Sequence, residues 1–191
     1  MMENLNNMEN LPELPLMKIV EYLSPEEITR LSSMCKRFYG ILPRFLRMRG
    51  ADFHLDGPHG GHRAPEYYFD GPVLETKVKS LKASVVWKDQ GWGNRKGRIF
   101  VKLMRPITSN RGFRKGLKSL RNKPKVEEIA KNEDMLGIAE HDWKTVSCLL
   151  VDDAVVKLAQ PGDFYCFMKE AGGGGGHKLF AKNFTILLQL T

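Results

Sequence analysis

The segment KDQGWGNRKG, residues 88–97, gathers side chains suited to binding a ligand. Trp92 stands between two glycines and offers a flat ring for stacking. Polar and charged side chains surround it, at Asp89, Gln90, Asn94, Arg95, Lys96 and Arg98. Glycines in such a loop allow a sharp turn or a close approach to a ligand. The composition predicts a recognition loop. The alternative is that Trp92 covers a sheet edge and that the glycines only satisfy turn geometry.

Other side chains with chemical potential do not form a convincing catalytic or metal site. His54, His59 and His62 lie in a segment rich in glycine and proline, without a cysteine or a second ligand cluster, so we expect them to be solvated. A nucleophile could be assembled from four scattered residues, His141, Asp142, Cys148 and Asp152. Cys148 falls in an expected strand, where a small buried thiol is the ordinary explanation. With no GxSxG, HExxH or P-loop motif, we expect a protein that is not an enzyme and has no cofactor and no metal.

Strands must position the recognition loop. Leu81, Ala83, Val85 and Trp87 alternate with polar residues, and the same period of two returns at residues 99–103. The sequence predicts further strands at 143–151, 154–159, 164–169 and 183–190. Short strands separated by turns, without intervening helices, favour an antiparallel β-sandwich or jelly roll.

The formal charge of +8 is concentrated in one segment. Residues 105–125 contain eight Lys or Arg and no Asp or Glu, which predicts a basic loop inserted between strands. Such a loop could contact nucleic acid or an acidic partner, although a solvated loop serving solubility is the simpler interpretation. Three cysteines without a CxxC pair indicate a reducing compartment, the cytoplasm or else the nucleus. The sequence shows no secretion signal and no apolar run that would span a membrane.

The stretch LPELPLMKIVEYLSPEEITRLSSMCKRF, residues 11–38, is instead typical of short helices. Leu16, Ile19 and Leu23 lie on one helical stripe, and the residues Ser-Pro-Glu-Glu at 24–27 predict a capping box that starts a second helix. Apolar spacing then continues into a third helix. About 35 residues are too few to bury these faces alone, so a partner or the rest of the chain should cover them.

Residues 11–42 resemble an F-box, the three-helix motif that docks onto the Skp adaptor of cullin-based ubiquitin ligases. The resemblance rests on the LP pair, the residues EYL of the first helix and the stretch SPEEITRLSSMCKRFYGIL. It implies that the chain binds the Skp adaptor and, through it, a cullin. The implied adaptor contacts are Leu11, Pro12, Leu16, Ile19, Leu23, Ile28 and Leu31.

The second part, residues 70–191, is similar to the β-sandwich that follows the F-box in F-box proteins that recognise glycoproteins. The resemblance implies a ligand site on two loops at one end of the sandwich, residues 88–97 and 170–178. The second loop contains AGGGGGH, where the family has aromatic residues that stack on sugar. The implied target contacts are Asp89, Gln90, Trp92, Asn94, Arg95, Lys96 and His177.

These observations predict an α+β chain, with a small three-helix F-box followed by an antiparallel, jelly-roll-like β-sandwich. The expected parts are a disordered N-terminus at 1–10, the F-box at 11–50, a linker at 51–72, and a sandwich at 73–191 with a basic insertion at 105–133. The expected function is substrate recognition in a Skp-cullin-F-box ubiquitin ligase, whose target is a protein, a glycoprotein being one option. The alternative is a stand-alone module that binds carbohydrate, or binds nucleic acid through the basic loop.

Overall fold

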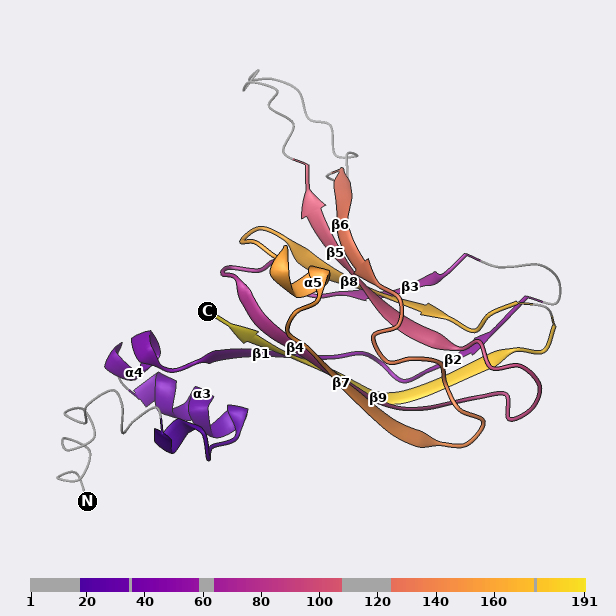
Figure 1. The fold of residues 1–191 in the computed structure, drawn as a ribbon, viewed down its shortest axis with the longest axis horizontal. Coiled ribbons are helices and arrows are strands. Elements are labelled where there is room, and N and C mark those ends of the chain that lie inside the picture. Colours follow the sequence, from indigo (N-terminus) through magenta and orange to yellow (C-terminus); the bar gives the residue numbers. More distant parts are fainter. Residues whose placement is uncertain (1–17, 35, 59–63, 108–124, 174) are drawn as a thin grey trace.

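The computed structural model describes residues 18–34, 36–58, 64–107, 125–173 and 175–191 (Figure 1). The elements run in the order α3 (Pro25–Met34), α4 (Lys36–Ile41), β1 (Arg44–Arg49), β2 (Phe53–Asp56), β3 (Glu66–Asp70), β4 (Val78–Asp89), β5 (Arg98–Pro106), β6 (Val126–Asn132), β7 (Lys144–Leu150), α5 (Ala154–Lys157), β8 (Phe164–Glu170) and β9 (Lys178–Leu190).

The strands form two antiparallel sheets. Sheet A has the order β1-β9-β4-β7, and β2 also pairs with β9. Sheet B has the order β3-β8-β5-β6. Both sheets contribute large apolar side chains to one core, so the predicted β-sandwich is confirmed.

The core follows the period-two pattern of the longest strands. Leu81, Ala83, Val85 and Trp87 of β4 are fully buried, as the alternation predicts. Tyr165 and Phe167 of β8 meet them from sheet B. Burial of this continuous core supplies the main stabilisation of the sandwich, because apolar area removed from water is the dominant favourable contribution to folding.

Residues 18–42, called the helical part below, pack around a separate small cluster. Val20, Ile28, Phe38 and Leu42 are its buried members. The predicted capping box is present: the backbone N–H of Ser24 donates to Glu27 Oε2 at 2.7 Å, and the N–H of Glu27 donates to Ser24 Oγ at 3.3 Å. Hydrogen bonds from the Ser24 backbone and side chain lower the pKa of Glu27, so this cap keeps its charge in mildly acidic solution. The three-helix arrangement is not confirmed, since most of the expected first helix lies outside the described residues.

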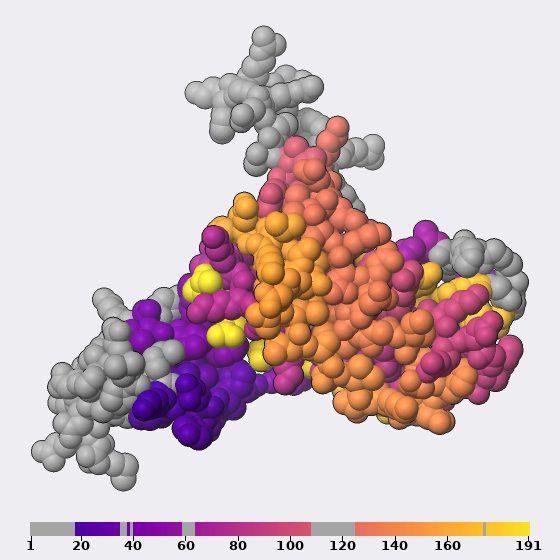
Figure 2. Space-filling view, viewed as in Figure 1, coloured from indigo at the N-terminus to yellow at the C-terminus, as the bar shows by residue number. Residues whose placement is uncertain are grey.

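Contacts from β1 join the helical part to the sandwich. Phe45 of β1 packs against the small cluster, and Arg47 of β1 forms an ion pair with Glu26 of α3. The space-filling view shows the helical part, in indigo and violet, protruding from one end of the sandwich (Figure 2). The β4–β5 and β8–β9 loops lie at the other end (Figure 1). The helical part and these two loops therefore lie at opposite ends of the sandwich.

The structure corrects several expected boundaries. The expected linker, 51–72, contains β2 and β3, and β1 lies inside the expected helical domain, 11–50. These strands are short, and β1, with the sequence RFLRMR, lacks a strict period of two. Only Leu42 and Pro43 separate it from α4, so the change from helix to strand leaves a weak signal. The expected insertion, 105–133, includes β6, an edge strand whose mostly exposed residues leave a weak periodic signal.

The predicted strand at 154–159 is wrong. Residues Ala154–Lys157 form the short helix α5, which begins at an N-cap where the carboxylate of Asp153 accepts a hydrogen bond from the N–H of Val155 at 2.9 Å. Val155 and Val156 are adjacent in sequence and both buried. A strand would have pointed these two side chains to opposite faces, whereas one helical turn brings both into the core.

Candidate functional site

The helical part carries four of the seven predicted adaptor contacts within the described residues. Ile19 is 42% exposed and available to a partner. Leu23, Ile28 and Leu31 instead belong to or pack against the small cluster, so in the free chain they support the fold of the helical part. Leu11, Pro12 and Leu16 lie outside the described residues.

Two further exposed apolar side chains of the helical part lie outside the seven implied adaptor contacts. Tyr22 is 88% exposed, and Met34 at the end of α3 is also exposed. With Ile19 they leave apolar surface uncovered on a part that is too small to bury it. The pattern at residues 16–23 placed Tyr22 off the apolar stripe, which is why periodicity did not select it.

The structure brings the two predicted recognition loops together. The Nζ of Lys96 donates to the carbonyl oxygen of Gly173 at 2.8 Å, and the N–H of Lys178 donates to Gln90 Oε1 at 3.2 Å. Trp92 lies beside Gly176, where an added Cβ would come within 3.1 Å of the indole. Residues 77 to 88 positions apart in sequence thus form one surface at this end of the sandwich.

Asp89 and Gln90 hold the first loop from within. Asp89 is fully buried, accepts a hydrogen bond from the N–H of Gly91 at 2.8 Å and lies 2.8 Å from His141 Nδ1. The amide of Gln90 donates to the carbonyl oxygens of Trp92 and Asn94. These side chains shape the loop. Asp89 is fully buried, which corrects its assignment as a target contact, whereas a contact from the partly exposed Gln90 stays a prediction.

The cations and His177 are also engaged within the protein. Arg95 forms an ion pair with Glu140 at 2.6 Å, and Lys96 is held by the second loop. His177 is buried, so its assignment as a target contact is corrected as well. At Gly172 the backbone has φ +85°, and a Cβ would lie 2.4 Å from that of Lys96, so glycine is required there for loop packing.

Trp92 is the main apolar group that this surface offers to a ligand. Its side chain is 63% exposed, whereas Trp87, five residues earlier on β4, is fully buried. Asn94 is exposed beside it. A ring of this size on a braced loop is suited to stacking against a planar or ring-shaped group.

Replacing Trp92 should separate binding from stability. Trp92→Ala is expected to change the melting temperature by less than about 2 °C, because exposed side chains contribute little to folding. Trp87→Ala, the matched control, should lower stability by roughly 3–5 kcal/mol, since it empties a core position. Differential scanning fluorimetry measures both. A large destabilisation by Trp92→Ala would assign this indole to the core of the loop instead.

The nucleophile hypothesis receives no support from Cys148. The thiol sits on β7, partly buried, and burial raises its pKa, which disfavours the reactive thiolate. Among the described residues, no group of three or more His, Cys, Asp or Glu side chains could hold a metal ion. His54 stacks on Phe180 and lies 3.2 Å from Asp56, while His59 and His62 fall outside the described residues. No helix in the described part of the chain is long and apolar enough to cross a membrane.

Comparison with known proteins identifies one domain. Residues 8–46 match the F-box domain, which covers the helical part and the start of β1. No curated protein matches the chain. The F-box resemblance seen in the sequence is thereby confirmed, with a β-sandwich following it.

Several solved structures with some likeness to the chain come from infectious bursal disease virus. The structure of infectious bursal disease virus Gx strain has 11% identity and a TM-score of 0.42, and covers 78% of this chain and 32% of its own. The VP2 subviral particle of infectious bursal disease virus has 12% identity and a TM-score of 0.39, and covers 78% of this chain and 33% of its own. The chain therefore spans about a third of the length of these structures.

Proposed function

We propose that this chain, which carries an F-box domain at residues 8–46, is the substrate-recognition subunit of a Skp-cullin-F-box ubiquitin ligase. The observation that carries the proposal is the F-box match itself, since F-box domains typically bind the Skp adaptor. Its helices leave Ile19, Tyr22 and Met34 exposed, as a docking surface requires. The subunit has no catalytic step of its own and works by bringing a target close to the assembled ligase, in the cytoplasm or the nucleus.

The separation of the helical part from the recognition loops supports the proposal that one binds the adaptor and the other binds the target. The helical part lies at one end of the sandwich and the paired recognition loops lie at the other (Figure 1). A partner bound to the helices would leave Trp92 open to a target. The cullin would then be reached through the adaptor.

The loops favour a target recognised by stacking. Most of their polar groups are already bonded within the protein, so the exposed indole of Trp92 and the amide of Asn94 are the groups left to a ligand. A ring face with a nearby amide suits a sugar of a glycoprotein, and it equally suits an aromatic side chain of a target. We propose a protein target and keep the glycoprotein as the first class to test.

Charge placed on the exposed helical residues should abolish adaptor binding. Ile19→Asp with Tyr22→Asp is expected to prevent co-purification with the Skp adaptor, because each interface anchor contributes roughly 2 kcal/mol or more. The assay is purification of the two proteins after co-expression, with circular dichroism of the variant. The control is Ile19→Val, which keeps an apolar side chain and should retain the adaptor.

A folded double variant that still co-purifies with the adaptor would overturn the ligase proposal. So would a wild-type chain that captures no adaptor. Leu23→Asp is unsuitable for this test, since Leu23 packs against the buried cluster and its loss would disturb folding.

A further inference from the structure

The solvent-facing side of sheet A, called the outer face below, is strongly basic. Leu81, Ala83 and Val85 point into the core, so the alternate residues of β4, such as Lys82 and Ser84, point outward. Residues that pair with Lys82 and Ser84 on the neighbouring strands point outward with them. The outward-facing cations in the described strands of sheet A are Arg47, Arg49, Lys82, Lys88, Lys178 and Lys182. The outward-facing carboxylate in the same strands is Asp56.

Most of these cations lack an acidic partner. Arg47 pairs with Glu26, and Lys178 lies 3.4 Å from Asp56. Arg49, Lys82, Lys88 and Lys182 form no ion pair among the described residues. Lys88 and Lys182 lie over the ring of Trp143, and the charges of all four side chains are available to an anionic partner.

The solvent-facing side of sheet B shows the opposite arrangement. Arg98 of β5 donates to Glu170 of β8 at 2.8 Å and lies 3.3 Å from Glu133. Lys102 of β5 pairs with Glu128 of β6 at 2.7 Å. The same sandwich therefore neutralises the cations of one sheet and leaves those of the other unpaired, so excess charge on the outer face is a local feature.

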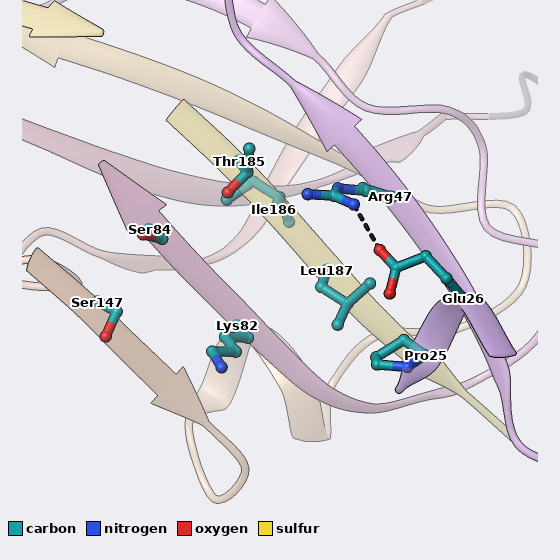
Figure 3. Close-up of a pocket in the computed structure, with 9 residues that line it drawn as sticks. All are labelled: Pro25, Glu26, Arg47, Lys82, Ser84, Ser147, Thr185, Ile186 and Leu187. Carbon is teal, nitrogen blue, oxygen red and sulfur yellow. Dashed lines mark hydrogen bonds and ion pairs between the residues drawn. The ribbon is translucent and has the colours of Figure 1, made fainter. Parts of the chain in front are cut away.

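The outer face is also hollowed beside the helical part. A hollow of about 370 Å³ is bounded by α3 and by strands β1, β4, β7 and β9. Figure 3 shows Lys82 and Ser84 on β4, Ser147 on β7, Thr185 on β9 and Arg47 on β1 around it. The three hydroxyl groups can donate hydrogen bonds to carboxylate oxygens of a ligand, and Lys82 can pair with them. Arg47 is already paired with Glu26, whose carboxylate also lines the hollow.

Apolar and aromatic side chains on the outer face indicate whether an acidic polypeptide or a nucleic acid fits it better. Leu149 of β7 is well exposed on this face, opposite Lys82. The ring of Phe180 is stacked on His54. Trp143 is 45% exposed, and its ring is contacted by Lys88 at 5.4 Å and by Lys182 at 4.4 Å from the centroid. Bases of a nucleic acid need free ring faces for stacking. Rings engaged in this way, next to an exposed leucine, suit a polypeptide that carries both carboxylates and apolar side chains.

We propose that the outer face of sheet A binds an acidic segment of a partner protein, an extended stretch in which Asp or Glu alternate with apolar residues. Carboxylates of the segment pair with the free cations, and its apolar side chains lie on Leu149 and Leu187. This surface does not include Trp92, Ile19, Tyr22 or Met34. It borders the recognition loops at Lys88 and Lys178, and α3 at Glu26.

A labelled acidic peptide tests the proposal with the full chain. The probe is a fluorescein-labelled peptide of Glu and Leu, about 12 residues long, which when extended reaches about 40 Å. Fluorescence anisotropy should show binding that weakens as salt rises from about 50 mM to about 500 mM. Lys82→Glu with Lys182→Glu should weaken it at least about tenfold, because both exposed cations then repel the peptide.

The matched control removes the same net charge elsewhere. Lys125→Glu with Lys157→Glu alters exposed lysines just before β6 and on α5, where Lys157 lies 3.2 Å from the exposed Asp152. Both lie away from the outer face, so the affinity should change less than about twofold. Leu149→Ser should weaken peptide binding without any change of charge. Equal losses in the two charge-reversed variants, or no effect of Leu149→Ser, would overturn the proposal.

A single-stranded DNA of similar length separates the two partner classes. Weaker binding of DNA than of the peptide supports the acidic segment. Tighter binding of DNA, lost with Lys82→Glu and Lys182→Glu but kept with Leu149→Ser, would overturn it in favour of a nucleic-acid surface. The ligase proposal is unaffected by either result, since adaptor capture is measured separately.

Discussion

Phe38→Ala is expected to unfold the helical part while the sandwich stays folded. Phe38 is 3% exposed and is one of the four buried side chains of the small cluster. Removing a buried phenylalanine costs roughly 3–5 kcal/mol. A cluster formed by so few residues has little stability to lose, whereas the larger core of the sandwich does not include Phe38. Adaptor binding should be lost together with the helices.

Amide hydrogen exchange tests this expectation separately for the helical part and the sandwich. Amides of α3 should lose protection in Phe38→Ala, while those of β4 and β9 keep it. Phe38→Leu, which retains most of the volume, should have a smaller effect of about 1 kcal/mol. Unfolding of both parts in one transition would show instead that Phe45 and the Arg47–Glu26 contact couple them into a single cooperative unit.

Asp89→Ala is expected to destabilise the recognition loops from inside. The change leaves the N–H of Gly91 and the ring of His141 without their buried acceptor. Loss of a hydrogen-bonded buried carboxylate should cost roughly 2–3 kcal/mol. The melting temperature should fall, and amides of residues 90–97 should exchange faster. Any target held through Trp92 should then bind more weakly, although the indole itself is unchanged.

Two controls define what Asp89 does. Asp89→Asn keeps an acceptor oxygen for Gly91 and should recover part of the stability. Asp152→Ala removes a carboxylate whose side chain is 89% exposed, so it should be nearly neutral. If Asp89→Ala were as stable as Asp152→Ala, the buried carboxylate would have no part in ordering the loop.

The sequence alone identified the features that depend on neighbours within a few residues. The alternation along β4 predicted which side chains enter the core, and the residues at 24–27 predicted a capping box with the observed hydrogen bonds. Trp87 was expected to be buried and is. For Trp92 the sequence left open a ligand contact and a cover over a sheet edge, and the side chain is 63% exposed. The F-box was recognised because its spacing is also local. Each of these patterns repeats over two to four residues, so it is visible before the chain folds.

Only the tertiary structure decided which polar groups remain free. Asp89 and Gln90 looked like ligand contacts, yet Gln90 accepts a hydrogen bond from the N–H of Lys178, 88 positions away. The valines of α5 favoured a strand until the cap at Asp153 and burial of both side chains selected a helical turn. The basic outer face arises because β9 lies between β1 and β4, which gathers cations from three distant segments without their carboxylates. Pairing and burial depend on residues brought together across the sheets, and composition along the chain does not contain that information.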